Sequence, residues 1–315
     1  MVNLFTVTPH TAIDHIITLD QLNTGNLVAN AAHQFPAGKG VNVAKTIASM
    51  KARVTALGFI GQQSTERFRP LDSTLLTTDF SQVPGFVRQN ITLQTRSIDQ
   101  ETHIRTPGFA VTEKDTHALI NKINATIQPD DIVILSGSLP PGCNSHFYAD
   151  VITHCHKKNT RILLDSSGQS LANSIKATPY LIKPNLIEME ALVGYPLTHT
   201  TAIINAAQHF IHQGIQVVIV SLGKDGIIAV TQAGAVQLRC DRLPNQELIN
   251  TIGCGDALMG GLALAYQQNK SFPEALKLAI SCATANLFSQ EPGNISPRLV
   301  NEIKSMVRLN SIKNP

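Results

Sequence analysis

The sequence predicts an α/β fold, in which a central, mostly parallel sheet is sandwiched by helices and carries a small inserted β-sheet lid. From residue 112 onward, stretches of helical periodicity alternate with short apolar stretches, which is typical of a parallel sheet covered on both faces. Before residue 112, stretches with one polar face interrupt this series, as expected of strands half exposed to solvent. We therefore expect residues 1–315 to form a single domain, with lid segments at about residues 12–35 and 86–107.

The first third of the chain is rich in predicted strands. Its apolar or alternating stretches predict strands at residues 3–8, 13–19, 54–60, 86–95 and 102–106. The last two flank the turn-rich segment Ser97-Ile98-Asp99-Gln100. Val41, Ala44, Ile47 and Ala48 recur at helical spacing, so a helix is expected before the third of these strands.

The rest of the chain alternates helix and strand. Thr112 and Asp115 have the spacing of a capping box at the start of a helix predicted for residues 112–127. Further helices are expected near residues 146–158 and 202–213, and strands at residues 132–136, 161–165 and 217–221. After Thr251 the pattern is helical for most of the remaining length, and Ser296-Pro297 predicts the start of the last helix.

Composition excludes several classes of protein. The 315 residues include 25 basic and 22 acidic ones, a net charge of +3, with 15% charged and 43% hydrophobic residues. This balance argues against disorder and against a highly charged nucleic-acid or membrane-surface binder. No run of 18 apolar residues occurs, and the first residues lack the pattern of a signal peptide. We therefore expect a cytoplasmic protein without a nucleic-acid or membrane partner.

The cysteines also favour a cytoplasmic protein. Five widely spaced cysteines without a C-x-x-C pair argue against a disulfide framework or structural zinc and favour reduced thiols. His154-Cys155-His156 resembles a metal cluster, but adjacent helical residues project in different directions and cannot converge on one ion.

The strongest local signal for chemistry is Gly253-Cys254-Gly255-Asp256, which runs into a predicted helix. Glycines at a helix start leave backbone N–H groups free to bind a phosphate. An aspartate at the same place could accept a proton from an attacking hydroxyl. A plain loop, whose aspartate favours the helix dipole, explains the residues equally well.

Two further motifs have both a structural and a functional interpretation. In Lys183-Pro184-Asn185-x-x-Glu188, the asparagine and glutamate fit a capping box. The same pair could organise a hydrated Mg²⁺ beside nucleotide phosphates. Gly38-Lys39-Gly40 fits a turn with a solvated lysine, or a helix start where an ammonium approaches a polyol or phosphate.

The order of the motifs is more informative than any one of them. From Thr8 to about Ser296 the chain resembles the ribokinase-like sugar kinases of the PfkB family. The matching motifs are Ala37-Gly38-Lys39-Gly40-Val41-Asn42-Val43-Ala44, Arg88-x-Asn90, Ser136-Gly137-Ser138-Leu139-Pro140-Pro141-Gly142, Leu164-Asp165-Ser166-Ser167-Gly168, Lys183-Pro184-Asn185-x-x-Glu188, Ser221-Leu222-Gly223-Lys224-Asp225-Gly226 and Gly253-Cys254-Gly255-Asp256. The Ala-Gly-Lys-Gly form and Pro107-Gly108-Phe109 are most similar to the phosphofructokinase branch, and within it to the 1-phosphofructokinases.

The resemblance implies MgATP as phosphoryl donor and a sugar phosphate as acceptor. It implies that Asp256 is the catalytic base and that the backbone of Gly253, Cys254 and Gly255 forms the anion hole for the transferred group. The implied acceptor site comprises Asp14, Gly38, Lys39, Asn42, Arg88 and Ser138. The implied ATP site comprises Lys183, Asn185, Ser221, Gly223 and Gly226, with Asn185 and Glu188 organising Mg²⁺ through water. A homodimer through the lid is implied as well, and a monovalent cation is left open.

We therefore expect an ATP-dependent kinase that converts fructose 1-phosphate to fructose 1,6-bisphosphate. Tagatose-6-phosphate kinase and 6-phosphofructokinase remain alternatives within the class. In another class, the chain could be a non-catalytic sensor of sugar phosphates, although a sensor would not need Asp256.

Some positions depart from the family pattern. His10 and Thr11 stand where the family has Asn-Pro, and Arg105 stands where Asn is common. Asn250 and Ala257 replace two frequent serines, and Cys254 replaces an alanine. None of these changes removes the proposed base or the glycines, but they bear on the sugar pocket.

Overall fold

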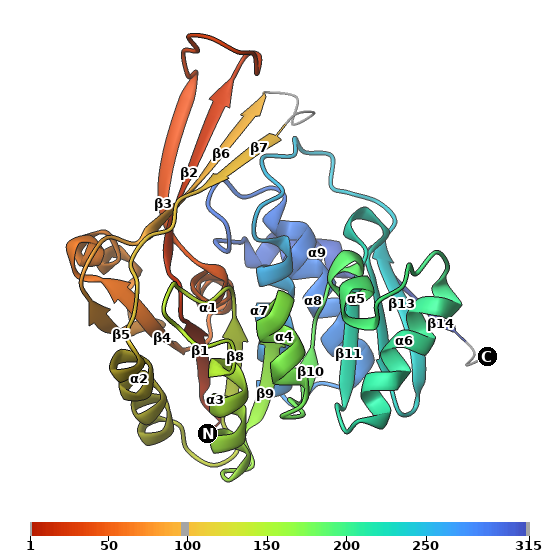
Figure 1. The fold of residues 1–315 in the computed structure, drawn as a ribbon. Helices are drawn as coiled ribbons and strands as arrows, with labels where there is room; N and C mark the ends of the chain where they lie inside the picture. The colour runs from red at the N-terminus through yellow and green to blue at the C-terminus, as the bar shows by residue number, and fades with distance from the viewer. Residues whose placement is uncertain (1, 96–100, 313–315) are drawn as a thin grey trace.

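The protein, seen in a computed structural model that describes residues 2–95 and 101–312, is built on two sheets (Figure 1). The larger has ten strands. From one edge to the other these are β14 (Val307–Ile312), β13 (Gly234–Cys240), β12 (Ile227–Thr231), β11 (Val217–Ser221), β10 (Leu181–Ile182), β9 (Arg161–Asp165), β8 (Ile132–Ser136), β1 (Leu4–Thr8), β4 (Val54–Gly61) and β5 (Leu76–Val83).

The large sheet is mostly parallel, as predicted. From the edge strand β5 across the sheet to β11, neighbouring strands pair in parallel, whereas β12, β13 and β14 pair in the antiparallel direction. The antiparallel part was not expected. Within it, β12 and β13 are antiparallel because the turn that joins them is too short to hold a crossover helix: Thr231 pairs with Gly234, which has a φ of 138°.

Helices cover both faces of this sheet (Figure 1). One layer contains α1 (Lys39–Ser49), α7 (Cys254–Gln267), α8 (Phe272–Asn286) and α9 (Pro297–Lys304). The other contains α2 (Glu113–Thr126), α3 (Phe147–His156), α4 (Gly168–Ile175), α5 (Leu186–Val193) and α6 (Thr200–His212). The strands between the layers are almost wholly apolar and buried, as in Ile132–Ser136, because a doubly covered strand has no solvent-facing side.

The smaller sheet has four strands and rises from the carboxyl ends of the parallel strands (Figure 1). Its order is β3 (Ala31–Ala37), β2 (Ala12–Leu19), β6 (Arg88–Thr95) and β7 (Glu101–Arg105). These strands lie at the segments expected to form the lid, with β3 ending two residues beyond. The predicted turn at residues 97–100 lies outside the described residues. That the whole chain is one domain stays a prediction.

Several local predictions are confirmed. Thr112 and Asp115 exchange both hydrogen bonds of a capping box at α2. Ser296 caps α9, with Pro297 in its first turn. His154 Nδ1 lies 2.7 Å from the carbonyl oxygen of Asp150, and His156 Nε2 lies 2.8 Å from that of Ala177.

The sequence did not predict all elements. Strands β3, β5, β10, β12, β13 and β14 and helix α4 were missed. Strand β3, for example, reads Ala-Ala-His-Gln-Phe-Pro-Ala, without β-branched residues, and is held by pairing with β2. Within the described residues, no helix is long and apolar enough to cross a membrane.

Candidate active site

A cavity of about 510 Å³ lies where the lid meets the carboxyl ends of the parallel strands. Arg88 and Arg105 line it from the lid, and Asp165, Lys183 and Ser221 line it from the ends of β9, β10 and β11. This edge of an open parallel sheet is where ligands generally bind. The cavity brings together most residues predicted for the site: Asp14, Gly38, Lys39, Asn42, Arg88, Ser138, Lys183, Asn185, Glu188, Ser221, Gly253, Cys254, Gly255 and Asp256.

Gly223 and Gly226 are the two predicted site residues that do not line this cavity. They lie in and just after the single 3₁₀ turn that follows β11. A side chain at Gly226, where φ is 84°, would run into Leu238 and Arg239 of strand β13. Its glycine is therefore explained by close packing, and contact of either residue with a nucleotide stays a prediction.

The start of helix α7 supplies free backbone donors. Gly253 is the N-cap residue, with a left-handed φ of 81°, and within the described ranges no side chain caps this end. A Cβ at Gly253 would lie 2.9 Å from Pro292 Cβ, so both conformation and space require glycine. The first N–H groups of a helix have no partner within it. Those of α7 border the cavity and can bind an anion.

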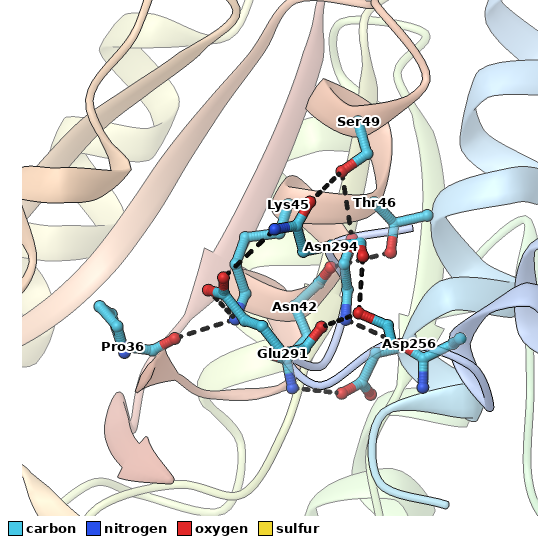
Figure 2. A network of polar contacts seen from close by, with 11 residues as sticks. Pro36, Asn42, Lys45, Thr46, Ser49, Asp256, Glu291 and Asn294 are labelled. Atoms are coloured by element: carbon cyan, nitrogen blue, oxygen red, sulfur yellow. Dashed lines mark hydrogen bonds and ion pairs between the residues drawn. The ribbon is translucent and has the colours of Figure 1, made fainter. Parts of the chain in front are cut away.

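Asp256 stands in the first turn of α7 and is only 6% exposed. Its Oδ2 accepts a hydrogen bond of 2.9 Å from Asn42 Nδ2, which comes from helix α1 (Figure 2). Burial raises the pKa of Asp256 to about 7, and the negative charge of Asp165 adds to this rise. Lys39, Asn42 and Lys183 oppose it only in part. A carboxylate with such a pKa can take a proton near neutral pH.

Asp165 forms a second buried centre, to which sequence reasoning assigned no role. Its side chain is 1% exposed, and it pairs with Lys39 at 3.0 Å and with Lys183 at 3.2 Å. Burial alone would raise the pKa of Asp165, but the two ammonium groups outweigh it and lower the pKa. The ion pair with Asp165 also raises the pKa of Lys39. A usable signal was present, because Asp165 ends a predicted strand in a parallel sheet, where polar residues face the ligand edge.

The lid contributes a third carboxylate and two guanidinium groups. Asp14 of β2 is buried, which raises its pKa, and it accepts a hydrogen bond of 2.7 Å from Asn90 Nδ2. In the lid sheet, Asn90 of β6 pairs with Asp14 of β2 on one side and with Arg105 of β7 on the other. Arg88 lies on β6, two residues before Asn90. The charges of both arginines act on Asp14. Asn90 and Arg105 are thus cavity residues to which sequence reasoning gave no role.

The pair Asn185 and Glu188 forms the predicted capping box of α5. Asn185 N donates to Glu188 Oε2 at 2.9 Å, and Glu188 N donates to Asn185 Oδ1 at 2.8 Å. Both residues also line the cavity. The capping box uses only Oε2 of Glu188, so Oε1 takes no part in the box. The cap and an Mg²⁺ role are therefore compatible. A single carboxylate oxygen fits a hydrated Mg²⁺, which keeps most of its waters.

Known proteins resemble the chain over nearly its whole length. Residues 5–299 match the family described as pfkB family carbohydrate kinase. The 1-phosphofructokinase of Bacillus subtilis is 29% identical over 92% of this chain and 94% of its own, and that of Escherichia coli is 32% identical over 88% of each.

Two solved structures show the same fold. Phosphofructokinase-2 from Escherichia coli, solved with substrates and products, has a TM-score of 0.87 at 26% identity, covering 96% of this chain and 99% of that one. Ribokinase from Thermotoga maritima has a TM-score of 0.74 at 20% identity, covering 97% and 100%.

The chain belongs to the pfkB family of carbohydrate kinases. The predicted family, the ribokinase-like fold and the predicted enzyme class are confirmed.

Proposed function

We propose that the protein transfers the terminal phosphoryl group of ATP to a sugar phosphate, and that the acceptor is fructose 1-phosphate, which becomes fructose 1,6-bisphosphate. The observation that carries the proposal is Asp256, a buried carboxylate with a pKa of about 7 beside the free amides of α7. The relatives named 1-phosphofructokinase support the choice of acceptor.

The residues of the chain would share the work as phosphoryl transfer requires, chiefly by positioning and charge stabilisation. Asp256 would orient the acceptor hydroxyl and take its proton. The amides after Gly253 would bind the oxygens of the moving phosphoryl group. Lys39 is held by Asp165, and the charges of Asp256 and Glu188 also act on it. We therefore place the Lys39 ammonium beside the transferred phosphoryl group, between the acceptor and the ATP phosphates.

The phosphate already present on the acceptor would bind at the lid. Arg88 and Arg105 lie near enough for their charges to repel, and neither forms an ion pair with a carboxylate of the described residues. Such a pair is suited to a dianion, because a guanidinium can hold phosphate with two parallel hydrogen bonds. Asp14 would accept hydrogen bonds from ring hydroxyls and so select the orientation of the sugar.

Mg²⁺ would be held by Glu188, with Asn185 keeping that carboxylate in place through the capping box. When bound, the ion neutralises charge on the nucleotide phosphates. The residues fit an ion bound through water, since they offer one free carboxylate oxygen and no cluster of three acidic or histidine ligands within the described ranges.

A coupled assay of ADP release tests the proposal. The panel contains fructose 1-phosphate, fructose 6-phosphate, tagatose 6-phosphate and unphosphorylated fructose, each with and without added potassium. We expect kcat/KM for fructose 1-phosphate to exceed the others by at least about tenfold, which corresponds to roughly 1.4 kcal/mol. A different order would assign the function to the other sugar phosphate kinases. Sugar-phosphate binding without any ADP release would instead support the sensor.

Arg88→Ala tests the acceptor end of the site. Loss of a hydrogen bond to a charged group should raise KM for the sugar phosphate by about 10- to 100-fold, with KM for ATP nearly unchanged. Arg53→Ala, at an exposed position of the same residue type, is the control. Equal effects on both KM values would remove Arg88 from the acceptor pocket.

Two further expectations stay proposals. The tip of the lid exposes Leu27 and Val28, the latter 86% exposed, and we propose that copies of the chain associate there. Light scattering of Val28→Glu against the wild type would test this. The five cysteines are all free thiols, which supports the proposed cytoplasmic setting.

A further inference from the structure

Lys45 places a buried ammonium beside the proposed acceptor site. It lies on α1, one turn after Asn42, and its side chain is 6% exposed. Its Nζ donates to the carbonyl oxygen of Pro36 at 3.0 Å and to Glu291 Oε1 at 3.2 Å. Figure 2 shows Lys45 between these two partners, with the bond from Asn42 to Asp256 close by.

The Pro36 contact joins Lys45 to the lid. Pro36 stands next to the end of β3, and in the lid sheet it pairs with Ile13, the neighbour of Asp14. Because Lys45 belongs to the buried core helix α1, its bond to Pro36 ties the base of β3 to that helix. It thereby fixes the paired strand β2, which carries Asp14.

The Glu291 contact joins Lys45 to the turn that forms the anion hole. Glu291 belongs to the loop between α8 and α9. In this loop Pro292 packs against Gly253, and Gly293 N donates to Asn286 Oδ1 at 2.8 Å. The amide of the same Asn286 side chain donates to the carbonyl oxygen of Ile252 at 2.6 Å. The loop thus supports Gly253 through Pro292, and Ile252 through Asn286 at the end of α8.

The charge of Lys45 has three carboxylates around it. They are Glu291 from the loop, Asp14 from β2 and Asp256 from α7. Burial lowers the pKa of Lys45, and the three negative charges oppose that effect. A buried ion pair is weak as a source of net stability, because replacing both partners by hydrophobic residues of similar size is often neutral. The position of this charge therefore needs another explanation.

We propose that Lys45 is a positioning residue for phosphoryl transfer: it joins the base of the lid and the loop behind the anion hole to α1, and so holds Asp14 and Asp256 in register with one acceptor. Lys45 acts through these residues and does not touch the substrate. This inference rests on the proposed function.

Three variants test it: Lys45→Met, Lys45→Arg and Glu291→Gln. Lys157→Met is the control, because Lys157 is exposed and follows α3, in the helix layer on the face of the sheet opposite α1. In Lys45→Met we expect kcat/KM for the sugar phosphate to fall at least about tenfold, with KM for ATP little changed. The melting temperature should fall as well, because Glu291 loses its buried partner, and Lys45→Arg should restore it. Lys45→Arg should recover most of the activity, since it restores a buried cation that can reach both partners. Glu291→Gln should give an intermediate loss.

The pH dependence separates positioning from packing. Asp256 faces Lys39, Asn42 and Lys45 of α1, Asp165 at the end of β9 and Lys183 after β10. Removing the charge of Lys45 should raise the pKa of Asp256, which can be followed by ¹³C NMR of its carboxyl group. Unchanged titration and unchanged kcat/KM in Lys45→Met would overturn the proposal, and so would a parallel loss of stability and of ATP binding that Lys45→Arg does not repair.

Failure of the proposed function would look different. A wild-type protein that releases no ADP with any sugar phosphate refutes that function. The titration of Asp256 in wild type and Lys45→Met still decides whether Lys45 controls the carboxylate, and calorimetry with fructose 1-phosphate still decides whether it orders the acceptor site.

Discussion

Asp165 and Asp256 are two buried carboxylates of the same cavity, and their surroundings shift their pKa values in opposite directions. Asp165 is paired with Lys39 and Lys183, and its pKa is lowered although burial opposes this. Asp256 has an amide hydrogen bond from Asn42 but no direct ion pair with any residue that the structure describes, and burial raises its pKa to about 7. The difference is one of partners, since both side chains are nearly inaccessible to water.

This contrast assigns the roles. Carboxylates whose environments separate their pKa values are suited to different tasks. Asp165 stays charged and holds two ammonium groups in place, whereas Asp256 can exchange a proton near neutral pH. Their proximity matters too, because the charge of Asp165 helps to raise the pKa of Asp256. The following predictions test the contrast, from the largest expected effect to the smallest.

Asp256→Asn should lower kcat by roughly 10²–10⁴-fold, the usual contribution of a general base. The fold should survive, and the melting temperature at pH 8 should not fall. A carboxyl whose pKa is raised on folding binds its proton more tightly in the folded state, so it destabilises the fold as pH rises from about 4 toward 7 and above. Steady-state kinetics and calorimetry measure both effects. Wild-type turnover in the variant would falsify the assignment.

Asp165→Asn should act mainly on stability. It leaves Lys39 and Lys183 without their carboxylate, and breaking a buried pair in this way costs about 3–5 kcal/mol. Chemical denaturation measures the loss. Glu66→Gln, which breaks an exposed pair with Arg69, is the control and should lose about 1 kcal/mol or less. Since the pKa of Asp165 is lowered on folding, its contribution is present above its unfolded pKa and disappears as pH falls through the folded value.

The pH profile should show the contrast directly. We expect log kcat/KM to rise with pH and to level off near pH 7, where Asp256 loses its proton. Among the groups that lower the pKa of Asp256, Lys39 has the largest effect. Lys39→Met should therefore shift the acid limb to higher pH besides lowering the rate. A limb that stays in place would show that another group controls it.

Glu188→Gln should have the smallest effect on the protein itself, because glutamine also serves in a capping box. If Glu188 organises Mg²⁺, the variant should need a several-fold higher Mg²⁺ concentration for half-maximal activity at an unchanged melting temperature. An unchanged Mg²⁺ titration would restrict Glu188 to the cap.

Local predictions succeeded where a few neighbouring residues decide the structure. Thr112 with Asp115, Asn185 with Glu188, and Ser296 with Pro297 each cap a helix as their spacing indicated. Such caps need only residues three or four positions apart. The failures have the opposite character. The edge strand β5 reads Leu-Thr-Thr-Asp-Phe-Ser-Gln-Val, a weak strand pattern that becomes a strand by pairing with β4.

The sequence alone determined the alternation of buried strands and helices, the glycines and Asp256 at one helix start, and the order of motifs that marks the family. Those properties depend on local periodicity and on residue types that are read directly. Only the tertiary structure decided which charges meet. Asp165 and Lys39 form an ion pair although they are 126 residues apart in the sequence, and Asn42 and Asp256 are hydrogen-bonded although they are 214 residues apart. Burial and the distance between charges set the pKa of a carboxyl group, and both arise only when α1, β9 and α7 come together at the same edge of the sheet.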